Sequence, residues 1–302
     1  MPDRQANSDS VCAEGRLLSW SIALLLVCLC CCGLTGPLHA HESQDEDGAR
    51  AVRVGPTAPM IDGRFDDDVW RTAPIATGFT QQDPSEGESA TEETAFQVAY
   101  DDEALYIAIL CYDSDPQEVV RRLYRRDQIQ HGETDWVGVL LDPHHDHQTG
   151  FEFAVTPSGS YADDAIANDS DVDGTWNSVW QVETAIHERG WSVELKIPYH
   201  ALRFSPKEEY TWGINVYRRV NRKQEFSMWV LTRRDEAGIS SRNGHLEGIR
   251  GIHPPAHIEV LPYTVARQTL DPRAAGYLDG RDFFSGLGSV CLVLLPQFLV
   301  RG

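Results

Sequence analysis

Hydrophobic and polar residues alternate in short segments between residue 54 and about residue 263. Positions 96–100, 191–197 and 212–216 place an apolar side chain at every second residue, which is the spacing of a strand with one buried face. Gly, Pro and Asp punctuate the segments, as at 142–143. Many short strands joined by such turns predict an all-β domain over 54–263. We expect a two-sheet β-sandwich of jelly-roll or immunoglobulin-like architecture.

The alternation also predicts the interior of the sandwich. Helical periodicity is confined to one or two turns at 66–72 and 116–124. Cys111 lies within an apolar strand, so we expect a buried, inert thiol. The side chains expected in the core are those of Val98, Leu105, Ile107, Val139, Phe153, Val193, Leu195, Ile197 and Ile214.

The two ends of the chain depart from this pattern. Residues 21–35 form a short apolar run that follows two arginines and leads into small residues up to Ala40. This is typical of a secretory signal peptide, so we expect residues 1–40 to be removed near Ala40 and the protein to be exported. The polar residues 41–53 are predicted to be a linker. Residues 264–302 are predicted to be an irregular tail.

Five of the seven cysteines lie within residues 12–32 and would leave with the signal peptide. Cys111 and Cys291 remain, which excludes a disulfide scaffold, a zinc ribbon and a CxxC redox site. The chain carries 46 acidic against 26 basic residues, a formal net charge of −20. This balance argues against nucleic acid as a partner, because phosphate binding needs clustered positive charge. It suits divalent cations or neutral ligands.

An acidic loop carries the clearest metal-like pattern. Asp169, Asp171 and Asp173 alternate in the sequence DSDVDG, and alternate carboxylates can surround one cation. The twelfth position of an EF-hand loop needs Glu and here holds Trp180, so an EF-hand is excluded. A looser calcium site and a solvated acidic loop both remain open.

A second polar loop contains several histidines. Residues 144–147 read HHDH and follow Asp-Pro between two predicted strands. Histidines are zinc ligands, but a hairpin loop is the better interpretation of this sequence than a zinc site, because two imidazoles in a flexible loop make a weak site.

Candidate carbohydrate-binding residues follow the acidic loop. Trp176 and Trp180 flank Asn177, and indole rings stack on the apolar faces of sugars while amides and guanidinium groups bind their hydroxyls. Arg125 and Arg126 belong to the main basic cluster and are the candidate guanidinium donors. The alternatives are that the tryptophans belong to the core and that the arginines pair with surrounding carboxylates.

Four motifs occur in an order that resembles family 9 carbohydrate-binding modules. They are IDGRFDDDVW at 61–70, YDDEALYI at 100–107, DWVGVLLD at 135–142 and GWSVELKIP at 190–198. Within that superfamily, RRD at 125–127 and WGIN at 212–215 resemble a bacterial subgroup in which the module precedes a predicted membrane β-barrel.

The resemblance implies a calcium-supported β-sandwich that binds sugars between aromatic rings and cleaves no bond itself. It further implies a periplasmic, outer-membrane-associated or extracellular location, and an outer-membrane barrel as partner in full-length relatives. The tail at 264–302 would then be the start of such a barrel. We weigh three functions: an exported carbohydrate-binding module, a structural periplasmic domain without sugar binding, and a glycosidic-bond hydrolase. The last ranks lowest because no acid/base pair is recognisable.

Overall fold

The computed structural model describes residues 48–254, 257–270 and 281–294, and nearly all of its regular structure is β. A continuous sheet curls back on itself in the order β8-β7-β6-β5-β11-β13-β1-β3-β4-β10-β9, and β12 and β2 extend it beside β11. The strands are β1 (Gly48–Arg53), β2 (Thr80–Asp83), β3 (Thr94–Tyr100), β4 (Ala104–Tyr112), β5 (Trp136–Asp142), β6 (Gly150–Val155), β7 (Tyr161–Ala167), β8 (Asp171–Asp173), β9 (Gln181–His187), β10 (Gly190–Pro198), β11 (Glu209–Val220), β12 (Glu225–Met228) and β13 (Gly244–Arg250).

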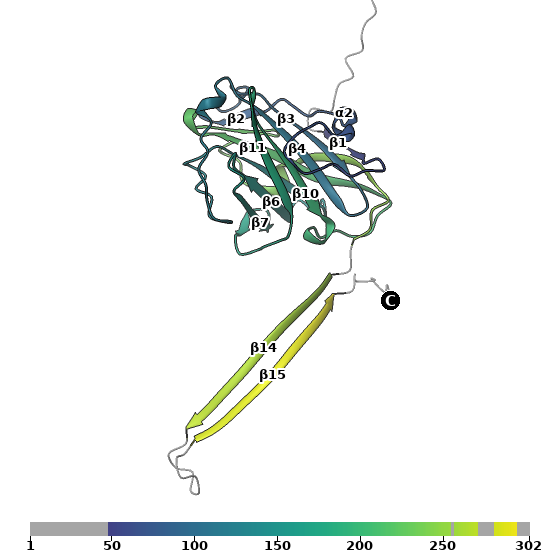
Figure 1. The fold of residues 1–302 in the computed structure, drawn as a ribbon, viewed down its shortest axis with the longest axis vertical. Coiled ribbons are helices and arrows are strands. Elements are labelled where there is room, and N and C mark those ends of the chain that lie inside the picture. The colour runs from purple at the N-terminus through teal and green to yellow at the C-terminus, as the bar shows by residue number, and fades with distance from the viewer. Residues whose placement is uncertain (1–47, 255–256, 271–280, 295–302) are drawn as a thin grey trace, which may run out of the picture. The chain divides into compact units, whose positions relative to one another are not determined.

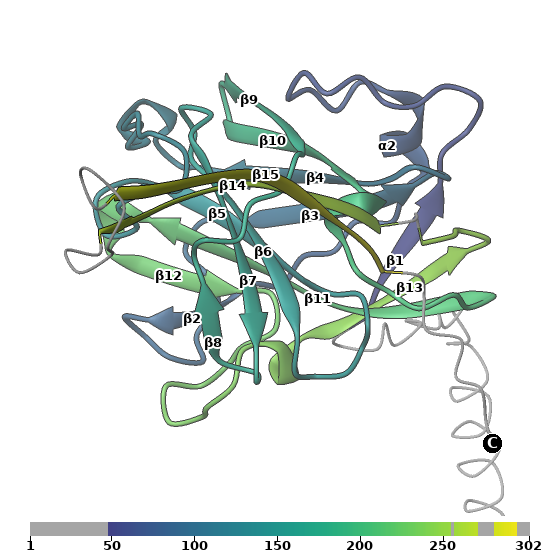
Figure 2. The ribbon, with the colours of Figure 1, turned by 90° about the horizontal axis from the view of Figure 1, so that it is seen from below.

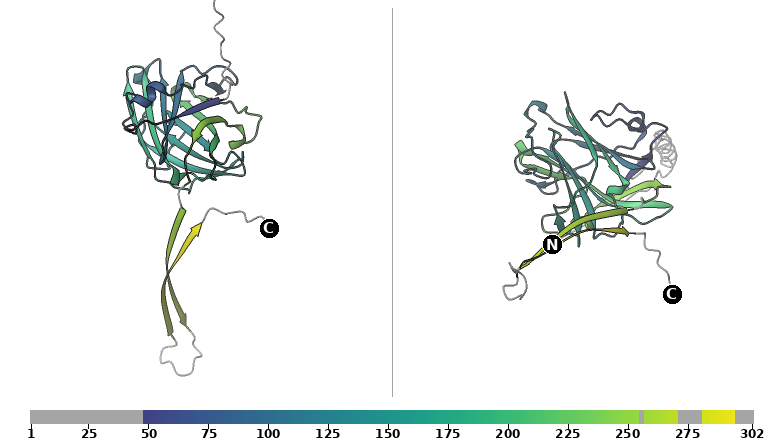
Figure 3. Two further views of the ribbon diagram at one scale, coloured as in Figure 1. Left: turned by 90° about the vertical axis from the view of Figure 1, so that its right-hand side faces the viewer. Right: turned by 60° about the horizontal axis from the view of Figure 1, so that its bottom comes forward.

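The curl produces the two layers of the predicted β-sandwich, which is confirmed (Figures 1 and 2). One layer contains β3, β4, β10 and β9, and the other contains β5 to β8, β11 and β13. Strand β1 joins the layers, because residues 48–50 pair with β13 and residues 51–53 pair with β3, both in parallel. Both views in Figure 3 show this wrapping of the strands around a common interior.

Strand β1 corrects the predicted linker over 41–53. Residues 48–53 form a strand in which Ala49 and Ala51 are buried. Two arginines among these six residues concealed the alternation.

The interior between the layers is the predicted core. All nine side chains expected there belong to one buried cluster, and each is at most 1% exposed. Cys111 is fully buried in the same cluster, and burial raises the pKa of its thiol to about 12. The helical predictions hold in part: α2 covers Asp68–Thr72, whereas only the 3-10 turn η1 at Pro116–Glu118 forms within 116–124.

A segment before β2 covers the outer face of the β3–β4 layer. Val69 and Trp70 of α2 pack there against Tyr106 and other residues of the layer. Gly63 enters this segment with φ +79°, and a Cβ on it would lie 2.7 Å from the backbone carbon of Thr184 in β9. Only glycine allows both the left-handed conformation and this close approach.

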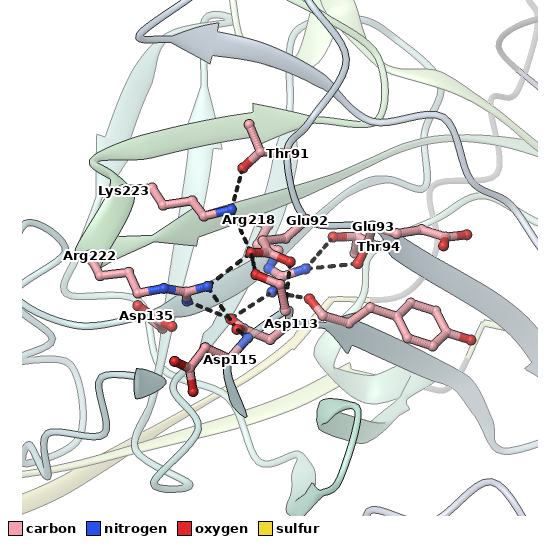
Figure 4. A network of polar contacts seen from close by, with 12 residues as sticks. Thr91, Glu92, Glu93, Thr94, Asp113, Asp115, Asp135, Arg218, Arg222 and Lys223 are labelled. Carbon is pink, nitrogen blue, oxygen red and sulfur yellow. Dashed lines mark hydrogen bonds and ion pairs between the residues drawn. The ribbon is translucent and has the colours of Figure 1, made fainter. Parts of the chain in front are cut away.

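A buried polar network joins the two layers near the end of β4 (Figure 4). Arg218 of β11 is 1% exposed, and its Nη1 donates to the Glu93 carbonyl at 2.8 Å and to Thr94 Oγ1 at 3.0 Å. Its Nη2 donates to the Tyr112 carbonyl at 2.7 Å. The guanidinium thereby satisfies backbone carbonyls at the ends of strands in the opposite layer.

A second arginine extends the network. Arg222, in the turn η3 (Asn221–Lys223), donates to both oxygens of Asp113 at 2.7 and 2.8 Å and to Glu92 at 2.9 Å. Lys223 also donates to Glu92. Bidentate geometry and burial make these pairs stronger than exposed ones.

Beyond β13, the chain forms a separate two-stranded sheet. Strands β14 (His257–Leu270) and β15 (Arg281–Leu294) pair antiparallel along their whole length. The sequence predicts an irregular tail over 264–302, and the structure instead has strand over much of it. The predicted signal peptide lies outside the described residues. No helix in the described part is long and apolar enough to span a membrane.

Candidate functional site

The two predicted sugar-stacking tryptophans both pack against the sandwich. Trp180 is 6% exposed, and its ring lies edge-on to Phe153 at 5.1 Å and to Tyr161 at 5.0 Å between centroids. Trp176 is half-buried and rests on Phe151 at 4.9 Å. Trp180 is therefore part of the core, whereas Trp176 packs on one side and keeps partial exposure.

The structure places Arg126 against the loop that precedes Trp180. Its Nη2 donates to Asp163 Oδ1 at 2.7 Å and to the Ser178 carbonyl at 2.6 Å, and its guanidinium lies 5.2 Å from the ring centroid of Tyr161. These contacts hold the loop before Trp180 in place. Arg125 and Asn177 are exposed, and neither side chain has a hydrogen-bond partner among the described residues.

A cavity of about 480 Å³ is lined in part by the Trp180 segment. The strand register explains which residues meet there. Pro198 pairs with Ala104, and Lys196 pairs with Gln181, so the turn before β4, the end of β10 and the start of β9 share one end of the layer. The cavity is lined by Asp102, Glu103, Val179, Trp180, Gln181, Lys196, Pro198, Tyr199, His200 and His253.

Several polar groups of this cavity are free to bind a ligand. Glu103, Gln181, His200 and His253 have no side-chain hydrogen bonds within the part of the chain that the structure describes. Lys196 lies 5.6 Å from the Tyr106 ring centroid, in a cation–π contact. These groups include donors and acceptors, as a hydroxyl-rich ligand requires.

Other cavity groups are already engaged. Asp102 pairs with Arg53 at 2.9 Å, and Tyr199 donates its hydroxyl to the Asp101 carbonyl at 3.0 Å. Burial raises the pKa of Tyr199, so this phenol stays neutral. Trp180 Nε1 is buried without a partner among the described residues. Val179, at 73% exposed, supplies an apolar contact surface at the rim.

The three predicted calcium ligands accept hydrogen bonds from different residues. Asp169 accepts hydrogen bonds from the Ile239 and Ser241 amides at 3.1 and 2.8 Å. Asp171 accepts from Asn168, and Asp173 accepts from Thr175. Across the described ranges, no group of three or more His, Cys, Asp and Glu side chains is arranged as a metal site. Calcium binding by this loop stays a prediction.

Sequence reasoning missed the cavity residues outside the Trp180 segment. Asp102 and Glu103 occur in a predicted turn, and Lys196 and Pro198 belong to a predicted strand. The only signal was that both segments belong to motifs of the resemblance. Their proximity depends on the β4–β10 pairing, which alternation along the chain does not specify.

Comparisons with known proteins agree with this fold. The model for carbohydrate family 9 binding domain-like proteins matches residues 61–249. No curated protein matches the chain.

Solved structures similar to the chain include a family 9 carbohydrate-binding module from Caldicellulosiruptor kristjanssonii in complex with cellotriose. It is 17% identical, with a TM-score of 0.48 over 68% of this chain and 100% of that chain. The corresponding glucose complex is 17% identical, with a TM-score of 0.47 over 65% and 94%.

A Bacteroides uniformis protein is 13% identical, with a TM-score of 0.53 over 67% of this chain and 98% of that chain, and it shares the fold. The family model spans more than half of the present sequence. The chain therefore belongs to the carbohydrate family 9 binding domain-like family.

Proposed function

We propose that this domain binds carbohydrate, without cleaving it, in the cavity beside Trp180. The observation that carries the proposal is the lining of that cavity. Apolar groups of Val179, Trp180 and Pro198 lie together with the uncommitted polar side chains of Glu103 and Gln181. A sugar ring needs both kinds of contact, because its C–H faces are apolar and its rim carries hydroxyls.

The expected affinity is modest. Trp180 is too buried to offer a full ring face, so the apolar contact is small. The polar groups of the cavity also remain open to water, and their hydration must be replaced on binding. We expect dissociation constants between about 1 μM and 1 mM, which correspond to about −8 to −4 kcal/mol.

The surface around Trp176, Asn177 and Arg125 is a second location for the sugar. Its support is the partial exposure of Trp176 and the free side chains of the other two residues. Variants distinguish the locations. Gln181→Ala should weaken sugar binding if the cavity is the site, whereas Trp176→Ala should weaken it if the second surface is the site.

A glycan array with and without calcium tests the function itself. We expect retention of at least one neutral glycan, and no release of reducing sugar on prolonged incubation. The absence of binding to every glycan of the array would contradict carbohydrate binding, and released reducing sugar would favour the hydrolase. A calcium effect, and a rise in melting temperature with calcium, would support the proposed ion at Asp169, Asp171 and Asp173.

Export belongs to the same proposal. Its support is the signal-like composition of residues 1–40, and mass spectrometry of secreted protein should find an N-terminus near His41. Intact Met1 on a protein that stays in the cytoplasm would contradict it. We place the exported protein in the periplasm, at the outer membrane or outside the cell.

A structural role beside an outer-membrane barrel is the second candidate function. The observation in its favour is the pair β14 and β15, whose 14-residue strands exceed the 9–11 residues that span a membrane as tilted β-strand. A silent glycan array, together with recovery of the natural protein in outer-membrane fractions, would favour this role.

A further inference from the structure

Three histidines converge on the outer face of the layer that contains β5, β11 and β13. Nε2 of His145 lies 3.1 Å from Nδ1 of His245, although the residues are 100 positions apart. The ring of His147 lies 4.7 Å from that of His145 between centroids. His145 and His147 belong to the loop between β5 and β6, and His245 belongs to β13.

Hydrogen bonds to Asp142 at the end of β5 hold the loop that carries His145 and His147. Oδ1 of the buried Asp142 accepts the His145 amide at 2.7 Å, and Oδ2 accepts the His147 amide at 2.9 Å. One carboxylate thereby fixes the backbone on both sides of Asp146. These two hydrogen bonds to the end of β5 set the position of the loop that carries both imidazoles.

Glycines leave room for His145 to reach His245. His245 is in register with Gly213 of β11 on one side and with Gly48 of β1 on the other. Paired residues in neighbouring strands project to the same face of a sheet, so both neighbours of His245 on that face lack a side chain. The imidazole from the β5–β6 loop can therefore approach from above.

We propose that His145 and His245 chelate a divalent transition-metal ion through Nε2 and Nδ1. Nitrogen ligands bind zinc at about 2.0–2.1 Å, so two of them are about 2.9 Å apart at a right angle and about 3.3 Å apart at the tetrahedral angle. The observed 3.1 Å lies between these values. Binding needs a shift of only a few tenths of an ångström.

The chemistry of the donors selects the ion. Imidazole nitrogen suits Zn²⁺, Cu²⁺ and Ni²⁺, whereas Ca²⁺ prefers oxygen ligands. This site is therefore distinct from the acidic loop at 169–173. His147 packs beside His145, and its Nδ1 is buried without a hydrogen-bond partner among the described residues, but the three histidines are not arranged as a three-ligand metal site. Water completes the coordination, so the affinity should be lower than that of a four-ligand structural site.

Titration of the chain from residue 41 onward with Zn²⁺ and with Cu²⁺, after removal of metal by chelator, tests this site, because the cysteines within residues 12–32 would themselves bind these ions. The chain has 11 histidines, so the comparison of variants isolates the pair from background binding. We expect one tight equivalent in isothermal titration calorimetry, weakened at least tenfold by either His145→Ala or His245→Ala. His144→Ala is the matched control, because it removes an exposed imidazole of the same loop and should change nothing.

Electron paramagnetic resonance of the Cu²⁺ complex gives an independent readout. The native protein should show coupling to two or more imidazole nitrogens, and His245→Ala should lose one of them. His245 lies on a strand, so its variant leaves the loop sequence intact if His145→Ala perturbs folding. Unchanged affinity in both variants, or an equal loss in His144→Ala, would show that the 3.1 Å contact is only a hydrogen bond between the two rings.

Discussion

The indole Nε1 of Trp70 donates a 2.7 Å hydrogen bond to Oε1 of Glu194, across the covered outer face of the β4–β10 layer. The other oxygen of Glu194 accepts the amides of Asp62 and Gly63 at 3.0 and 2.9 Å. One fully buried carboxylate thus joins the IDG and Trp elements of the first motif to the Glu of the last motif. Two sequence signatures 120 or more residues apart are therefore one structural contact.

Loss of this carboxylate should destabilise the domain strongly. Glu194→Ala leaves two amides and one indole N–H unpaired, at about 1–3 kcal/mol each, so we expect a loss of at least about 3 kcal/mol. Trp70→Phe removes only one donor and should cost less. Urea unfolding measures both, and a change below about 0.5 kcal/mol for Glu194→Ala would show that the contact is unimportant.

Replacement of Arg218, the central arginine of the network that links the layers, should destabilise the domain strongly. Arg218→Met leaves the carbonyls of Glu93 and Tyr112 without their buried donor and should cost about 3–5 kcal/mol. Arg219→Met, the next residue, is the matched control. Its guanidinium bonds an exposed Gln224, and its loss should cost about 1 kcal/mol or less. Equal effects of the two variants in chemical denaturation would refute the assignment.

Truncation of one aliphatic side chain tests which face of β10 is buried in the core. Leu195 is fully buried between the layers, so Leu195→Ala should cost about 2–5 kcal/mol, including the cavity that it leaves. Thermal or urea unfolding gives the value. A loss typical of surface positions would mean that β10 faces the other way.

The raised pKa of Glu152 should make the stability of the domain depend on pH. This residue is paired across β6 and β7 with Asp164, and burial, followed by the charge of Asp164, raises the pKa of Glu152 to about 7. A raised folded-state pKa means that the folded protein binds the proton more tightly. The resulting stabilisation is complete below about pH 4.5 and is lost as the pH rises through about 7.

The matched variant is Glu152→Gln, which keeps the shape and cannot ionise. Relative to this variant, the native protein should lose on the order of 2 kcal/mol between pH 4.5 and pH 8, allowing for partial contact with water. Parallel pH profiles of unfolding free energy for the two proteins would contradict the shifted pKa.

The sequence predicts the strands and the core well because both depend on local alternation. It predicts less where function depends on pairing between distant strands. The cavity needs the register of Lys196 with Gln181, and the histidine pair needs His145 to meet His245. Tryptophan is the residue type expected to stack on a sugar ring, yet Trp180 packs against Phe153 and Tyr161 and is buried. Residue type alone does not distinguish a core indole from an exposed one.

Isothermal titration of the native protein and of Gln181→Ala with the neutral glycan that the array retains tests the central claim most directly. Gln181 is an exposed residue at the start of β9, so its truncation should leave the melting temperature within about 2 °C, as expected for a surface change. The account predicts native binding between about 1 μM and 1 mM and at least fivefold weaker binding by the variant. Equal binding by both proteins would place the sugar elsewhere. The absence of binding to every glycan of the array would contradict carbohydrate recognition by this domain.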